Sequence, residues 1–184
     1  PFNLRSKLTT LINREIKHAK AGKKAEIFLK LNNLVDEDVI ERLYQASKFG
    51  VKVRLIIRGI NSLVPGLPGI SENIQAISIV DKFLEHNRVF IFHNAGNPDL
   101  FIGSADLMTR NLDHRIEIVM PILDEKVKKQ LMQIMEIQWK DNVKARLFNE
   151  TQSNEFKRRT TAEKAIRSQD AIYDFLQDAA VKKK

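Results

Sequence analysis

The sequence lacks cysteine altogether. Disulfide bonds and thiolate catalysis are therefore excluded, and the composition is consistent with a reducing compartment. No uninterrupted apolar run approaches the roughly 18 residues of a membrane span, and residues 1–10 lack the hydrophobic stretch of a secretory signal. Since the chain starts at Pro1 rather than at methionine, we expect it to be a piece of a longer chain.

Two common nucleotide-binding loops are also absent, because neither G-x-x-x-x-G-K-[ST] nor G-x-G-x-x-G occurs in the sequence. No pair of histidines has the close spacing of a protein zinc site, so we expect no structural metal. If this chain binds phosphate, it must do so through arginines and turns.

The composition is that of a folded protein, with 43% apolar and 29% charged residues. A chain of 184 residues is long enough for one full-sized domain and too short for two independent cores. We therefore expect residues 1–184 to form a single domain. Lys and Arg outnumber Asp and Glu by 31 to 23, and the net charge of +8 indicates an anionic partner such as a phosphate, a nucleic acid or a membrane surface.

Hydrophobic periodicity predicts alternating strands and helices. Residues 26–31 form an apolar run typical of a buried strand, residues 36–44 carry a helical pattern after a capping aspartate, and residues 51–57 alternate as a second strand. This unit implies two parallel strands joined by a helical crossover. Residues 59–71 contain repeated Pro-Gly pairs and predict a long ordered loop or lid.

Further elements follow the same patterns. We expect strands at residues 74–80, 89–92, 100–102 and 116–120, and helices around residues 8–19, 124–139 and 165–176. Turn residues at 94–98 predict that the strands at 89–92 and 100–102 form a hairpin. Ser6 is the expected cap of the first of these helices and Asp124 that of the second, and Pro121 is expected to end the last strand. Residues 150–184 are expected to form a basic connector and a terminal helix, with a disordered tail at Lys182–Lys184. These elements predict an α/β fold.

His86 and Arg58 are the leading candidates for chemistry. His86 precedes a predicted strand, and its imidazole could give or take a proton near neutral pH. Arg58 ends the second predicted strand, where ligands collect in open parallel sheets, and its planar fork of donors suits phosphate. From these residues alone, a backbone-bonded histidine and a surface ion pair remain alternatives.

Six segments carry a resemblance to a known family. They are Leu34–Asp36, Gly50–Val53, Ile57–Ile60, Gly69–Ile74, Phe83–Arg88 and Gly103–Asp113. Together they resemble the carboxyl-terminal domain of bacterial polyphosphate kinase, and the similarity runs from about Arg5 to Phe175. The resemblance implies a phospholipase D-like mixed β-sheet flanked by α-helices. It also implies a part in the reversible transfer of the terminal phosphate of ATP to polyphosphate.

The resemblance further implies what this chain lacks. The phosphohistidine and the arginines that bind Mg²⁺ belong to the preceding domain of the full-length chain, so we expect the fragment alone to be inactive or incomplete. ATP or ADP and polyphosphate are the implied substrates, and Mg²⁺ is expected for the full enzyme. The preceding domains are the implied partners, and homo-oligomerisation is left open. We expect no specific nucleic-acid partner and a cytoplasmic location, with membrane association of the full-length enzyme left open.

Two family residues fall on matching motifs of this sequence. The arginine of Ile-Arg-Gly is Arg58 and the histidine of Leu-Glu-His is His86, and in the family both contact the nucleotide phosphates. Arg58 would neutralise charge on the transferred phosphoryl group, and His86 would stabilise or protonate the leaving oxygen. Further candidate phosphate contacts are Arg88, Ser104, Asp106, Arg110, Asn111 and Arg115.

Two other functions remain open. A phospholipase D-like phosphodiesterase or nuclease would use the motif H-x-K, followed by aspartate and Gly-Ser. Here the third position is Arg88 and the residue seven after His86 is His93, and a single motif would require dimerisation. The other alternative is a non-enzymatic basic module that binds polyanions.

Overall fold

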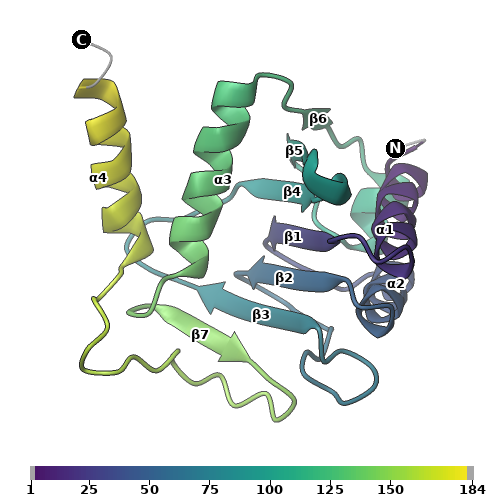
Figure 1. The fold of residues 1–184 in the computed structure, drawn as a ribbon, viewed down its shortest axis with the longest axis horizontal. Helices are drawn as coiled ribbons and strands as arrows, with labels where there is room; N and C mark the ends of the chain where they lie inside the picture. The colour runs from purple at the N-terminus through teal and green to yellow at the C-terminus, as the bar shows by residue number, and fades with distance from the viewer. Residues whose placement is uncertain (1–2, 182–184) are drawn as a thin grey trace.

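The computed structural model describes residues 3–181. A mixed sheet of seven strands, in the order β6-β5-β4-β1-β2-β3-β7, forms its centre (Figure 1). The elements in chain order are α1 (Leu4–Lys20), β1 (Glu26–Leu31), α2 (Glu37–Lys48), β2 (Lys52–Ile57), β3 (Ile74–Ile79), β4 (Arg88–Phe92), η1 (Asn94–Gly96), β5 (Asp99–Gly103), η2 (Arg110–His114), β6 (Val119–Pro121), α3 (Glu125–Trp139), β7 (Ala145–Phe148) and α4 (Ser168–Val181).

The central strands β1, β2 and β3 are parallel, whereas β4, β5, β6 and β7 each pair antiparallel with a neighbour. Helix α2 connects β1 to β2, so the predicted strand-helix-strand unit is confirmed. The predicted hairpin is also confirmed, since Phe90 lies opposite Phe101 in the pair of β4 and β5. The sheet contains both parallel and antiparallel strand pairs, and helices are interspersed with its strands along the chain, which confirms the predicted α/β class.

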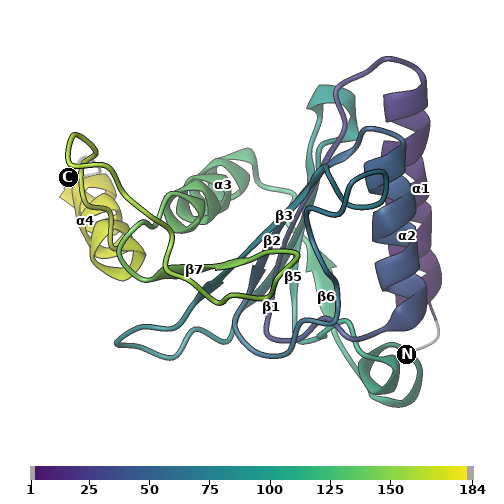
Figure 2. The ribbon, with the colours of Figure 1, turned by 90° about the horizontal axis from the view of Figure 1, so that it is seen from below.

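Helices cover both faces of the sheet. Figure 2 shows α1 and α2 on one face, α3 on the other, and α4 beyond α3. Because successive side chains of a strand point to opposite faces, a central strand must be apolar on both. Ile27 and Leu29 of β1 belong to the buried cluster beneath α1 and α2, whereas Phe28 belongs to the cluster that contains Met135 of α3. The apolar run at the start of β1 therefore indicates its central position.

Two predicted helix caps are confirmed. Asp36 accepts a hydrogen bond from the backbone N–H of Val39 at the start of α2. Asp124 accepts a hydrogen bond from the backbone N–H of Val127 at the start of α3. Both carboxylates satisfy N–H groups that have no partner within the helix.

Two other helix starts are predicted wrongly. Helix α1 begins at Leu4, and Ser6 lies within its first turn, where the hydroxyl donates to a backbone carbonyl one turn earlier. Helix α4 does not include Ala165 and Ile166. Instead, Ile166 accepts a hydrogen bond from the Asn142 backbone and donates one to the Asn142 side chain, which fixes this segment to the residues that follow α3.

The two edges of the sheet differ most from expectation. The strand predicted for residues 116–120 is shorter, because β6 starts later, and Ile116 and Ile118 are exposed rather than part of the core. Pro121 is the last residue of β6, so the strand ends at this proline as predicted, and an edge strand tolerates the proline because one of its sides makes no ladder bonds. Strand β7 at the other edge, antiparallel to β3, is absent from the sequence prediction.

The loop predicted for residues 59–71 is confirmed as a segment without helix or strand, and Leu63 and Ser71 are buried within it. The predicted disorder of Lys182–Lys184 lies outside the described residues. None of the helices in the described part of the chain is both long and apolar enough to traverse a bilayer.

Candidate functional site

Polar residues gather at the carboxyl ends of the parallel strands, which we call the open edge of the sheet to distinguish it from the lateral edge strands β6 and β7. Asn32 follows β1 and Arg58 follows β2, so their side chains leave the carboxyl ends of neighbouring parallel strands. His86 precedes β4, whose start lies at the same edge because β4 runs antiparallel to β1. Asp106 follows β5, whose end pairs with the start of β4. This is the edge at which open sheets with parallel strands bind ligands.

Arg58 and His86 are in direct contact at this edge. Nη2 of Arg58 lies 3.2 Å from Nδ1 of His86. Asn32 joins the two residues, because its Oδ1 accepts a hydrogen bond from Nε of Arg58 at 3.0 Å and its Nδ2 lies 3.3 Å from Nδ1 of His86. Asn32 is buried, Arg58 is half-buried and His86 is exposed. The two main predicted site residues therefore meet where solvent, or a ligand, can reach them.

The contact with Arg58 determines which ring nitrogen of His86 carries the proton. A guanidinium can only donate hydrogen bonds, so Nδ1 of His86 must be the acceptor. In the neutral imidazole the proton then resides on Nε2. The pair thus offers an incoming anion an N–H from the histidine ring beside the permanent charge of the guanidinium, and this arrangement suits phosphate oxygens.

Arg88 and Asp106, two further predicted site residues, form a buried ion pair. Nε and Nη2 of Arg88 donate to the two carboxylate oxygens of Asp106 at 3.2 and 3.1 Å. Nη1 of Arg88 donates to the backbone carbonyl of His86 at 2.8 Å. Each nitrogen of this guanidinium therefore has a protein partner, and the pair holds the backbone that carries the candidate histidine.

Asp106 remains ionised at this position. Burial by itself raises the pKa of Asp106, but hydrogen bonds from Arg88 and Asn33 outweigh that effect and hold the pKa below its ordinary value. The backbone N–H groups of Asn32 and Asn33 donate to the carboxylate at 2.8 and 3.1 Å. The carboxylate thus ties the end of β1 to the start of β4.

The remaining predicted residues lie in and around η2. The carboxylate of Glu117 accepts hydrogen bonds from the hydroxyl of Ser104 and from the buried amide of Asn111. None of the hydrogen bonds found within residues 3–181 connects this cluster directly to Arg58 or His86. Arg110 and Arg115 are exposed.

A groove of about 470 Å³ adjoins His86. Its walls come from the loop before β4 and from helices α3 and α4, with apolar contributions from Phe83, Leu84, Ile134 and Ile172. The exposed face of the histidine ring therefore borders open space rather than the core.

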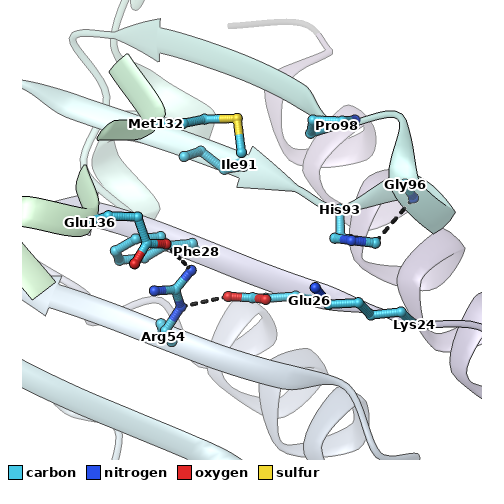
Figure 3. Close-up of a pocket in the computed structure, with 10 residues that line it drawn as sticks. All are labelled: Lys24, Glu26, Phe28, Arg54, Ile91, His93, Gly96, Pro98, Met132 and Glu136. Carbon is cyan, nitrogen blue, oxygen red and sulfur yellow. Dashed lines mark hydrogen bonds and ion pairs between the residues drawn. The ribbon is translucent and has the colours of Figure 1, made fainter. Parts of the chain in front are cut away.

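A different pocket, of about 270 Å³, lies at the opposite ends of the strands (Figure 3). Its floor includes Arg54, whose guanidinium stacks 3.9 Å above the Phe28 ring and bonds to the carboxylates of Glu26 and Glu136. Because two carboxylates surround this arginine, the pocket lacks the uncompensated positive charge that would attract a phosphate. His93 lines this pocket and so lies at the far end of β4 from His86.

The described residues 3–181 contain no group of three or more His, Cys, Asp or Glu side chains arranged to hold a metal ion. Ligation of Mg²⁺ by residues outside this chain stays a prediction.

Sequence reasoning missed several residues of the site. Asn32 and Asn33 directly follow the strand predicted at residues 26–31, and their position at its carboxyl end is the signal that could have identified them. Glu117 has no comparable signal, because its role depends on the path of the chain around η2.

Comparison with known proteins places these features in a family. Residues 1–169 match the family model for polyphosphate kinase C-terminal domain 2. The polyphosphate kinase of Vibrio vulnificus is 55% identical over 178 residues, which are 97% of this chain and 25% of that protein. The structure of polyphosphate kinase from Porphyromonas gingivalis has 44% identity and a TM-score of 0.94, covering 97% of this chain and 27% of that one. The chain thus spans about a quarter of the length of these relatives.

More distant structures confirm the predicted phospholipase D-like fold. Nuc from Salmonella typhimurium, a phospholipase D family member, matches with a TM-score of 0.52 and 17% identity over 73% of this chain and 88% of that one. This likeness concerns the fold alone. The match over residues 1–169 and the identity to polyphosphate kinases along nearly the whole chain show that this chain belongs to the polyphosphate kinase C-terminal domain family.

Proposed function

We propose that this chain is the carboxyl-terminal catalytic domain of a polyphosphate kinase, in which it binds phosphate groups of ATP or polyphosphate and assists reversible phosphoryl transfer between them. The names of its relatives support this activity, which belongs to a protein about four times as long as the matched region. The phosphohistidine would come from the preceding domain. The single-domain organisation of residues 1–184 is part of the same proposal.

One observation carries the proposal, namely the contact between Arg58 and His86 at the open edge of the sheet. In phosphoryl transfer, negative charge on the equatorial and leaving oxygens must be stabilised. The guanidinium of Arg58 would supply paired donors and a charge that does not titrate. Nε2–H of His86 would donate a hydrogen bond to the leaving oxygen and so stabilise the negative charge that develops there as the bond to phosphorus breaks.

Asn32 and the Arg88–Asp106 pair would support this arrangement without touching phosphate. Asn32 occupies one donor of Arg58 and orients the histidine ring. The ion pair fixes the His86 backbone through its carbonyl. Preorganised donors of this kind stabilise a transition state because they need no rearrangement when charge develops.

The proposal is tested by kinetics of the full-length enzyme with Arg58→Ala and His86→Ala. We expect kcat/KM for phosphoryl transfer from ATP to polyphosphate to fall by about 10²- to 10³-fold in each variant, a typical effect of removing a group that stabilises the transition state. Arg159→Ala and His93→Ala are matched controls, since Arg159 is exposed and His93 lies at the other end of β4. Wild-type kcat/KM in both Arg58→Ala and His86→Ala, with native circular dichroism, would contradict the proposal.

The phosphodiesterase alternative finds less support in the geometry. Arg88 occupies the position of the motif lysine, but all its nitrogens are engaged by Asp106 and the His86 carbonyl. His93, at the position of the motif aspartate, faces the pocket at the far end of the sheet. The likeness to Nuc concerns the fold alone and adds no support for this function.

ATP, polyphosphate and the preceding domains of the full-length chain are the proposed partners. The polyphosphate kinase names of the relatives support the substrates, and the net charge of +8 suits both. We also propose a cytoplasmic location and Mg²⁺ ligation in the full enzyme outside this chain.

A further inference from the structure

The loop that carries His86 has little backbone support of its own. It connects β3 to β4 and contains no helix or strand from residue 80 to residue 87. Among the described residues, the backbone-to-backbone hydrogen bonds outside the helices and strands include none from residues 81–87. The position of the imidazole therefore depends on contacts that side chains of other elements make with this loop.

Helix α4 provides the first of these contacts. The amide of Gln169 forms two hydrogen bonds with the backbone of Phe83, accepting from its N–H at 2.9 Å and donating to its carbonyl at 2.8 Å. Just before α4, the guanidinium of Arg167 forms a paired contact with Asp81 at 2.8 and 2.6 Å. The start of this helix thus holds two points of the loop.

Glu85, the residue before His86, receives contacts from three elements. One carboxylate oxygen accepts hydrogen bonds from Lys30 of β1 and from Gln138 of α3. The other accepts a hydrogen bond from Gln169 of α4 at 3.1 Å. No other residue of this loop is bonded to the sheet and to both helices at once. Lys30 and Gln138 are buried, so these partners have few alternative positions.

The charge on Glu85 is needed where it is. Burial lowers the pKa of Lys30, and the carboxylate of Glu85 partly offsets that effect by favouring the ammonium. A buried ammonium without its counterion is unfavourable, so the ion pair between Lys30 and Glu85 is maintained. Because His86 is covalently next to Glu85, contacts that hold the Glu85 carboxylate also restrict the backbone from which the imidazole projects toward Arg58.

We propose that Glu85 and Gln169 are positioning residues, which hold the His86 imidazole against Arg58 through the carboxylate and amide contacts described above. This inference rests on the proposed function of His86. It gives the carboxyl-terminal helix α4 a task in phosphoryl transfer, although none of its residues is placed to touch phosphate. Such positioning can have a large effect on rate, since a misplacement of a catalytic group by about 1 Å lowers the rate by up to about 100-fold.

The test is a double-mutant cycle in the full-length enzyme. We expect Glu85→Gln to lower kcat by about 10- to 100-fold and to lower it less than about twofold when His86→Ala is already present. Gln169→Ala leaves the Lys30–Glu85 pair intact and should behave in the same way. It therefore provides the test if Glu85→Gln folds poorly. Gln177→Ala, two turns further along α4, is the matched control and should keep the wild-type kcat.

A second measurement reads the ring directly. In samples with isotope-labelled histidine, the NMR signals that are missing from His86→Ala report the environment of this imidazole. They should shift in Glu85→Gln and Gln169→Ala and remain unchanged in Gln177→Ala.

The outcomes separate the two proposals. Equal loss of kcat from Glu85→Gln with and without His86, or ring signals that stay in place, would overturn the positioning role even if His86→Ala is slow. A wild-type rate in His86→Ala would overturn the proposed function instead, and the ring signals would then decide the positioning role alone.

Discussion

A phosphate can bind an arginine only where the guanidinium is accessible, and two arginines of this domain differ in that respect. Arg88 is buried, and its three nitrogens donate to Asp106 and to the His86 carbonyl. Arg58 uses Nε and Nη2 in contacts with Asn32 and His86 and is half-buried at an open edge. Equal charge therefore supports different roles: the contacts of Arg88 are structural, whereas the ligand-binding role of Arg58 is our proposal.

We predict that Asp106→Ala lowers the free energy of unfolding by about 3–5 kcal/mol, because it leaves the charge of Arg88 buried without a partner. Asp174→Ala, an exposed aspartate of α4, should change it by less than about 0.5 kcal/mol. Urea denaturation of the chain measures both values. Equal stability of the two variants would show that the ion pair has no structural role.

The same carboxylate predicts a dependence of stability on pH. Since folding lowers the pKa of Asp106, its contribution is complete above the ordinary carboxyl pKa of about 4 and is lost as the pH falls through the lower folded value. The stability difference between the wild type and Asp106→Asn should therefore be constant near neutral pH and shrink below about pH 4. A difference that grows on acidification would contradict the assigned direction of the pKa shift.

At the scale of elements, two aspartate caps share one local function and differ in their surroundings. Asp124 is exposed and only caps α3. Asp36 is buried, caps α2 and also accepts hydrogen bonds from Arg5 of α1 at 2.8 Å and from Thr109 at 3.0 Å. Its cap thus joins the two helices on one face of the sheet to the segment before η2.

We predict that Asp124→Ala lowers the free energy of unfolding by about 1 kcal/mol, the typical value for an N-cap. Asp36→Ala should lower it by about 3 kcal/mol, because charge-assisted bonds are lost together with the cap. Thermal or urea unfolding compares the two variants. If Asp36→Ala is no more damaging than Asp124→Ala, the bonds to Arg5 and Thr109 add nothing to the cap.

Local patterns account for which elements the sequence predicts. The unit of β1, α2 and β2 has apolar strands, a capping aspartate and a closing glycine, and these signals require no knowledge of the remainder of the chain. Strand β7 has only four residues and forms by pairing with the free edge of β3, so no local sequence pattern predicts it. Ile116 and Ile118 alternate like a strand, yet the pairing with β5 begins only at Val119.

At the scale of the whole molecule, topology brings the site together. The resemblance identifies Arg58 and His86 one by one, but their contact requires that β4 return antiparallel beside β1. Asn32 could have been identified from its position after β1, whereas Glu85 could not, because its contacts depend on that return and on the approach of α3 and α4. The sequence therefore predicts the chemistry of the edge better than its geometry.

A crystal structure with bound tripolyphosphate tests the central claim most directly. We predict a phosphate group within about 3 Å of the Arg58 guanidinium and of Nε2 of His86, a hydrogen-bonding distance for charged donors. The pocket around Arg54 and His93 at the far end of the strands provides the internal control. Phosphate bound in that pocket, with the edge that carries Arg58 and His86 empty at saturating ligand, would contradict the account.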